Sequence, residues 1–121
     1  MKSLFVLLIL TAGISAHVID DVPFVEQDTL YCGPASVSSV MAFYGVATDQ
    51  HQICKAVYSD AIKSSLITDL EDFAREKGFE TKLGRGWVED IKALIDEKKP
   101  VIVLLDFGFW VVSNPHYLVV F

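Results

Sequence analysis

The chain has 121 residues, of which 52% are hydrophobic, and its formal net charge is −6. This length predicts one domain with enough apolar residues to form a core without disulfides or a bound metal. The acidic balance and the lack of lysine or arginine runs exclude a typical nucleic-acid partner and an electrostatic contact with anionic membranes.

Residues 1–16 are predicted to be a secretory signal peptide. Lys2 supplies the positive charge, an apolar run covers residues 4–10, and small residues lead to a cleavage point near Ala16. The apolar run is shorter than the roughly 20 residues that span a membrane as a helix. We therefore expect export to the periplasm or the extracellular space, and a single domain over residues 17–121 with no stable membrane association after cleavage. An uncleaved N-terminal anchor is the alternative.

A cysteine at the start of a helix is the central feature of the sequence. Residues 17–27 contain β-branched residues and Pro23, which favours an extended lead-in at an edge. Cys32 follows, Pro34 suits a first helical turn, and apolar residues recur at helical spacing up to a stop at Gly45. Unpaired N–H groups at a helix N-terminus favour an anion, so a thiol there loses its proton more easily. Cys32 is a candidate nucleophile, and a buried structural cysteine is the alternative.

The middle of the chain predicts two more helices. Thr48 or Asp49 is placed to cap the first, which is expected to reach about residue 58 with His51 on its surface. After a connection over residues 59–67, the spacing of Thr68 and Glu71 predicts a capping box that starts the second helix.

The last part of the chain predicts strands around one more helix. Alternation over residues 79–83 predicts a short strand, and residues 87–98 predict a helix with acids early and lysines late. The run VIVLLDF over residues 101–107 predicts a buried strand, and residues 116–121 predict a closing strand. Helices followed by strands indicate an α+β fold, with the helices packed on a small antiparallel sheet.

The loop between the last two strands and the residues before the late helix carry large aromatic side chains. Trp87, Phe109 and Trp110 are candidates for lining a cleft, with ordinary core packing as the alternative.

The second cysteine, Cys54, is either a buried free thiol or a disulfide partner of Cys32. Cys54 lies on a helical apolar pattern and is expected to be a buried, unreactive thiol. A disulfide with Cys32 is the alternative, because an exported chain meets an oxidising compartment. The cysteines and histidines lack the paired short spacing of a metal site, so we expect no metal and no cofactor.

A histidine opens the closing strand and is a candidate partner for the thiol. His116 follows Asn114 and Pro115 directly. A thiol nucleophile needs a base from another part of the fold. A helix N-terminus packed against the start of a strand would bring Cys32 and His116 together. A structural histidine is the alternative.

Three stretches together resemble the papain-like double-glycine (bacteriocin-leader) peptidases over residues 22–121: VPFVEQDTLYCGPASVSSVMAFYG, PVIVLL and PHYLVV. The resemblance implies a papain-like α+β domain that hydrolyses peptide or amide bonds of a peptide or protein substrate. It implies that Cys32 is the nucleophile and His116 its base. It also implies that the Gln27 side chain and the Cys32 backbone N–H form the oxyanion hole.

The chain departs from the family pattern in two respects. The well-known members are fused to an export transporter, whereas we expect this chain to be an exported, stand-alone relative, so the processing of leader peptides is not implied. The pattern has an Asp or Asn on the strand after the histidine, whereas this chain ends at Phe121, soon after His116. We therefore expect one of three cases. The chain is truncated, or another group (Asn114, water or the backbone) orients His116, or the protein is inactive. A non-catalytic peptide-binding module of the same fold is therefore the alternative function. The sequence does not indicate an oligomeric state.

Overall fold

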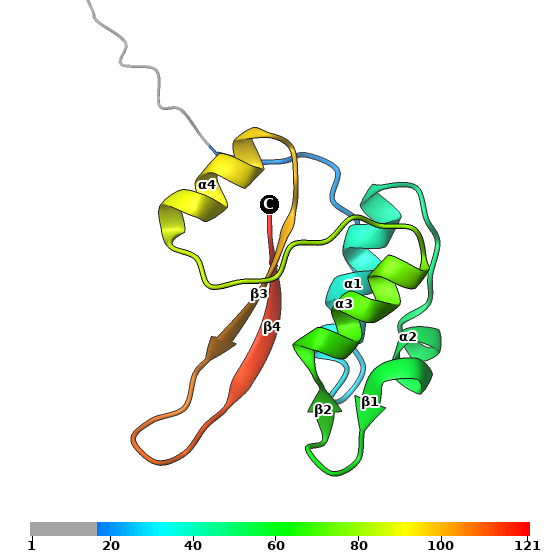
Figure 1. Cartoon of the computed structure of the whole chain (residues 1–121), viewed down its shortest axis with the longest axis vertical. Helices are drawn as coiled ribbons and strands as arrows, with labels where there is room; N and C mark the ends of the chain where they lie inside the picture. Colours follow the sequence, from blue (N-terminus) through cyan, green and yellow to red (C-terminus); the bar gives the residue numbers. More distant parts are fainter. Residues whose placement is uncertain (1–16) are drawn as a thin grey trace, which may run out of the picture.

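Four helices and two small antiparallel sheets form residues 17–121, the part of the chain that the computed structural model describes (Figure 1). The α+β class with a papain-like arrangement is confirmed. The predicted signal peptide lies outside these residues and stays a prediction. The elements are, in chain order, α1 (Cys32–Phe43), α2 (Gln50–Val57), β1 (Tyr58–Ser59), β2 (Ser64–Ser65), α3 (Ile67–Glu76), α4 (Val88–Asp96), β3 (Val101–Asp106) and β4 (Pro115–Val120).

Helix α1 is the centre of the molecule, with α2 and α3 on one side and β4 on the other (Figure 1). Nine of its residues are buried, including the serines at 36, 38 and 39. Each serine hydroxyl donates a hydrogen bond to a backbone carbonyl: Ser36 to Cys32, Ser38 to Thr48 and Ser39 to Pro23. These bonds explain how a helix rich in serine can lie in the core, because each buried hydroxyl has a partner.

The hairpin of β3 and β4 carries the last part of the chain. Leu105 pairs with His116 and Leu104 with Tyr117, so His116 and Tyr117 lie on opposite faces of the two strands. Tyr117 is 4% exposed and belongs to the core, whereas Leu104 and Leu105 are 41% and 43% exposed. The prediction of a buried strand over residues 101–107 is therefore wrong: the strand is present, but its first three residues are only half-buried and the rest are exposed. A two-stranded sheet has few neighbours to cover it.

Three local predictions are corrected by the structure. Residues 79–83 form no strand, since Thr81 bonds through its side chain to Arg75 and Glu71 rather than joining a ladder. Helix α3 begins at Ile67 with no side-chain cap, so the predicted capping box is absent and Glu71 accepts from Arg75 and Thr81 instead.

The third correction concerns residues 59–67. Instead of a plain connection, this stretch contains the turn and second strand of the short β1–β2 hairpin, in which Tyr58 pairs with Ser65.

The other expected elements are present. Helix α1 begins at Cys32, and the Asp49 carboxylate caps α2 by accepting from the His51 N–H at 2.7 Å. Within residues 17–121, no helix combines the length and apolar character needed to cross a membrane.

The burial of the core residues predicts how much stability is lost when one of them is truncated. Ile53 is fully buried in α2, and its replacement by alanine removes apolar contacts and leaves a cavity. We expect Ile53→Ala to lower the free energy of unfolding by about 2–5 kcal/mol in urea denaturation. Ile62→Ala is the matched control, because Ile62 is 50% exposed and its loss is expected to cost about 0.5 kcal/mol or less. Equal losses for the two variants would contradict this description of the core.

Candidate active site

Cys32 is the first residue of α1, and its side chain is only 9% exposed. Both cysteines are free thiols, and both are buried. The disulfide alternative is therefore not formed in the structure. Cys54, expected to be buried, contacts Tyr31. A side-chain hydrogen bond between Tyr31 and Cys54, and second the charge of Cys54, raise the pKa of Tyr31 above 10.0. The two thiols thus have separate surroundings, one at the start of α1 and one on α2.

The first turn of α1 contacts β4 closely at Gly33, where a side chain would crowd its neighbours. A Cβ atom on Gly33 would lie 3.0 Å from Cδ1 of Leu70 and 3.2 Å from Cδ2 of Tyr117. Glycine therefore lets the helix and the strand approach closely, next to Cys32 in the chain. The predicted packing of a helix N-terminus against the start of the last strand is confirmed.

Tyr117 holds this contact in place. Its hydroxyl donates a 2.8 Å hydrogen bond to the backbone carbonyl of Ser65. Burial raises the pKa of Tyr117 to about 12, and the neighbouring charges of Cys32 and Asp69 add to this effect. Cys32 and Tyr117 belong to the same buried cluster of the core, whereas His116 lies on the opposite face of the hairpin from Tyr117.

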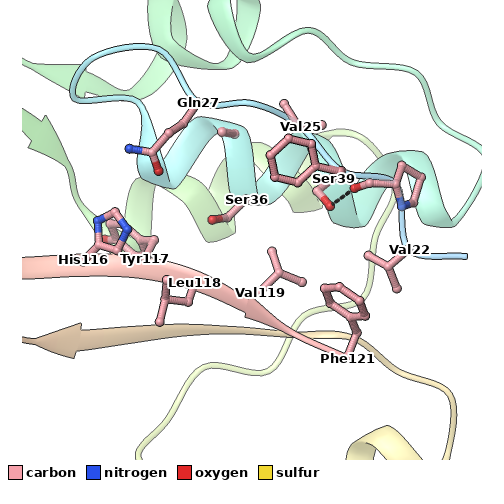
Figure 2. Close-up of a pocket in the computed structure, with 13 residues that line it drawn as sticks. Val22, Val25, Gln27, Ser36, Ser39, His116, Tyr117, Leu118, Val119 and Phe121 are labelled. Carbon is pink, nitrogen blue, oxygen red and sulfur yellow. Dashed lines mark hydrogen bonds between the residues drawn. The ribbon is translucent and has the colours of Figure 1, made fainter. Parts of the chain in front are cut away.

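A pocket of about 250 Å³ lies between the lead-in segment, α1 and β4 (Figure 2). Most of its lining is apolar, and its polar side chains include Gln27 from the lead-in, Ser36 from α1 and His116 from β4. Figure 2 shows the Gln27 side chain directed toward the end of the pocket where His116 lies. Two of the three predicted site residues, far apart in the sequence, are thus brought to one cavity.

Cys32 is not among the residues that line this pocket. It lies one helical turn before Ser36, whose hydroxyl donates to the Cys32 carbonyl at 2.6 Å. The described geometry therefore does not make the thiol part of the cavity wall. The catalytic pairing of Cys32 with His116 stays a prediction.

Phe107 is the side chain that packs against His116, with ring centroids 6.3 Å apart and an interplanar angle of 53°. It lies two residues beyond Leu105, the cross-strand partner of His116, so all three share one face of the hairpin. Sequence reasoning missed Phe107. The alternation of the two strands could have revealed it, once the register of the hairpin was known.

The turn before His116 is organised by a carboxylate. Asp106 accepts hydrogen bonds from the Ser113 hydroxyl at 2.7 Å, the Asn114 N–H at 2.7 Å and the Gly108 N–H at 2.8 Å. These bonds, the one from Ser113 above all, lower the pKa of Asp106 below 3.8. Within residues 17–121 the Asn114 side chain makes no hydrogen bond to His116. Its backbone instead helps fix the loop from which His116 emerges.

The three predicted cleft aromatics project into solvent. Trp87, Phe109 and Trp110 are 82%, 84% and 94% exposed, and none lines the pocket. Both interpretations of these residues, as cleft lining and as core packing, are therefore wrong. Phe109 and Trp110 lie in the loop between β3 and β4, which extends away from the body of the molecule (Figure 1).

A papain-like α+β domain with a cysteine at a helix start and a histidine at a strand start defines the class as cysteine peptidase-related. The model of the Peptidase_C39 like family matches residues 19–121. The chain therefore belongs to this family. A search among curated proteins and a search among solved structures each found no match.

The environment of Tyr117 predicts a measurable response to alkali. Since the pKa of Tyr117 in the folded chain is about 12, above the ordinary 10.0, the residue stabilises the fold below pH 10. That contribution is lost as the pH rises from 10 toward 12. We expect Tyr117→Phe to remove the highest tyrosine ionisation from an ultraviolet titration. We also expect it to lower the free energy of unfolding at pH 7 by about 1–3 kcal/mol, because the Ser65 carbonyl loses its donor.

Tyr44→Phe is the control, because Tyr44 is 48% exposed and makes no described side-chain hydrogen bond. A titration curve that keeps its highest ionisation in Tyr117→Phe would contradict the assignment.

Proposed function

We propose that this chain is an exported thiol hydrolase that cleaves peptide or amide bonds through an acyl-enzyme on Cys32. His116 is the base, and Gln27 forms the oxyanion hole with the backbone N–H of Cys32. Membership of the Peptidase_C39 like family supports this proposal. The observation that supports it most is the pocket that Gln27 and His116 both line, together with Ala35 and Ser36 of α1.

The reaction proposed for these groups has two steps. His116 takes the proton from the Cys32 thiol, the sulfur attacks the carbonyl carbon of the substrate, and the amine leaves with a proton returned by His116. Water then attacks the thioester carbonyl, with His116 as base, and the carboxylic acid and free thiol are released. No metal or cofactor takes part in either step.

Gln27 is proposed to act on the carbonyl oxygen. Its side-chain amide is a donor, and the negative charge on that oxygen is largest in the transition state. A donor fixed in advance stabilises the transition state more than the substrate, so it raises kcat with little effect on KM. Removal of one such donor typically costs about 100- to 1000-fold in kcat.

A non-catalytic peptide-binding module is the second candidate function. The small exposure of Cys32 favours it, since a nucleophile needs access to its substrate. The apolar lining of the pocket would then hold side chains of a bound peptide without cleaving it.

Acetyl transfer from p-nitrophenyl acetate tests the proposal without knowledge of the natural substrate. We expect rapid release of p-nitrophenolate and a protein mass increase of one acetyl group, mapped to Cys32 by peptide mass spectrometry. Cys32→Ala is expected to abolish labelling. His116→Ala is expected to slow it by about 100-fold or more, because the base is lost. Gln27→Ala is expected to slow it about 100-fold through kcat.

The chain supplies a matched control for each substitution. Cys54→Ala, His17→Ala and Gln52→Ala change the same residue types outside the proposed site and are expected to retain the original rate. Acetylation that maps to Cys54, or that proceeds equally well in His116→Ala and His17→Ala, would overturn the proposed hydrolase. The binding module would then be favoured.

A further inference from the structure

The segment that carries Gln27 has no regular secondary structure of its own. Residues 17–31 form neither helix nor strand, so the backbone around Gln27 lacks the ladder of hydrogen bonds that fixes a strand. Among the described residues of this segment, one backbone–backbone hydrogen bond joins two of its own members: the Tyr31 N–H donates to the Asp28 carbonyl at 3.0 Å. The position of Gln27 must therefore come from side chains of other elements.

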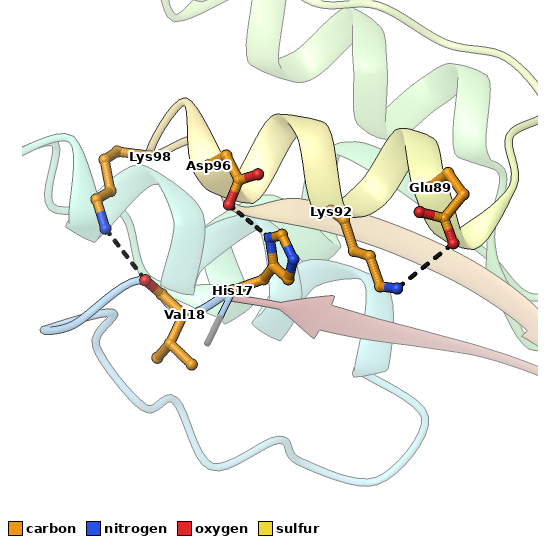
Figure 3. A network of polar contacts seen from close by, with 6 residues as sticks. All are labelled: His17, Val18, Glu89, Lys92, Asp96 and Lys98. Carbon is orange, nitrogen blue, oxygen red and sulfur yellow. Dashed lines mark hydrogen bonds and ion pairs between the residues drawn. The ribbon is translucent and has the colours of Figure 1, made fainter. Parts of the chain in front are cut away.

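The far end of the segment is attached to α4 and the residues after it (Figure 3). His17 lies 2.6 Å from the Asp96 carboxylate, and Lys98 donates to the Val18 carbonyl at 3.2 Å. In the middle, the Ser39 hydroxyl bonds to the Pro23 carbonyl. None of these contacts lies next to Gln27 in the chain.

A single side chain holds the backbone on both sides of Gln27. The Gln50 amide nitrogen donates to the Glu26 carbonyl at 2.7 Å, and its amide oxygen accepts from the Asp28 N–H at 3.1 Å. The planar amide thus pairs with the chain much as a neighbouring strand would, with one donor and one acceptor in a fixed relation. This two-point bond restricts both peptide groups that flank the oxyanion residue.

The element that presents Gln50 is itself well anchored. Gln50 is the first residue of α2, a helix capped by Asp49 and fixed in the core through the fully buried Ile53. The next residue, His51, adds a contact of 2.9 Å from its Nε2 to the Asp28 carboxylate. The first turn of α2 therefore fastens residues 26–28 to a rigid part of the molecule.

The Gln27 side chain takes no part in this fastening. Within residues 17–121 its amide makes no hydrogen bond, and it is directed into the pocket beside His116 (Figure 2). The chain thus fixes the backbone at this point and leaves the side-chain donor available. A fixed backbone limits the positions that the Gln27 side chain can reach, which is one condition for a preorganised oxyanion donor.

We infer that Gln50 is a positioning residue for catalysis: its amide holds Glu26 and Asp28 so that Gln27 is preset in the oxyanion hole. The inference rests on the function proposed above, because it gives Gln27 the oxyanion role. Gln50 touches neither the substrate nor the thiol, and acts only through Gln27.

The test uses Gln50→Leu, which keeps the approximate size of the side chain and removes both hydrogen bonds. Gln52→Leu is the matched control, since Gln52 is an exposed glutamine on the same helix with no described bond to residues 26–28. Two readouts are needed, one that depends on activity and one that does not.

The first readout is amide hydrogen exchange and side-chain ¹⁵N relaxation by NMR. In Gln50→Leu we expect faster exchange of the Asp28 amide and greater mobility of the Gln27 side-chain NH₂, with no such change in Gln52→Leu. An Asp28 amide that stays equally protected would overturn the inference, whether or not the chain is a hydrolase.

The second readout is the rate of Cys32 acetylation by p-nitrophenyl acetate. We expect Gln50→Leu to slow it about tenfold through kcat, because a small displacement of a catalytic group is costly. In a Gln27→Ala background the same substitution is expected to cost nothing further, since its effect passes through Gln27. An equal loss in both backgrounds would overturn the positioning role. An absence of acetylation in the unmodified chain would contradict the proposed function, and the NMR result would still test the hold of Gln50 on residues 26–28.

Discussion

The close approach of α1 and β4 at Gly33 is the constraint on which the rest of the structure depends. A Cβ atom at this position would lie 3.0 Å from Leu70 and 3.2 Å from Tyr117, so a larger residue would force these side chains to shift, whereas glycine lets the helix and the strand approach without crowding. This contact places the start of α1 beside the start of β4. Cys32 precedes Gly33 in the chain and His116 precedes Tyr117, and the catalytic pairing of Cys32 with His116 stays a prediction.

The other parts of the site are fixed by side chains rather than by sheet or helix hydrogen bonds. The Asp106 carboxylate organises the loop before His116, and the Gln50 amide holds the segment around Gln27. Phe107 packs on the His116 ring from the same face of the hairpin. Irregular backbone at a site is thus made rigid by a few polar anchors, which is the condition for a preset geometry.

Much of this architecture could be predicted from the sequence, because it follows from local rules. Apolar spacing and Gly45 located α1, the pair Thr48 and Asp49 located the start of α2, and the runs after Pro100 and Pro115 located the two long strands. His116 was a candidate from its place at the start of the closing strand, the role of Gln27 came from the resemblance to a peptidase family, and both residues line one pocket of the structure.

The remaining features depend on tertiary contacts that no local pattern specifies. The alternation at residues 79–83 is real, but a strand needs a partner, and Thr81 instead bonds to side chains of α3. The role of Gln50 is invisible in the sequence, since its two partners are carried by a segment far away in the chain. The small exposure of Cys32 likewise depends on how Tyr117 and Leu70 pack around the first turn of α1.

The most direct test of the central claim is the rate at which iodoacetamide alkylates Cys32 as a function of pH, in a Cys54→Ala background. We predict a rate that stays high well below the reference thiol value of about pH 8.5 and falls when His116 is replaced by alanine. The same replacement at His17 is expected to leave the profile unchanged. A rate that rises only near pH 8.5 and ignores His116 would contradict a working thiol–imidazole pair.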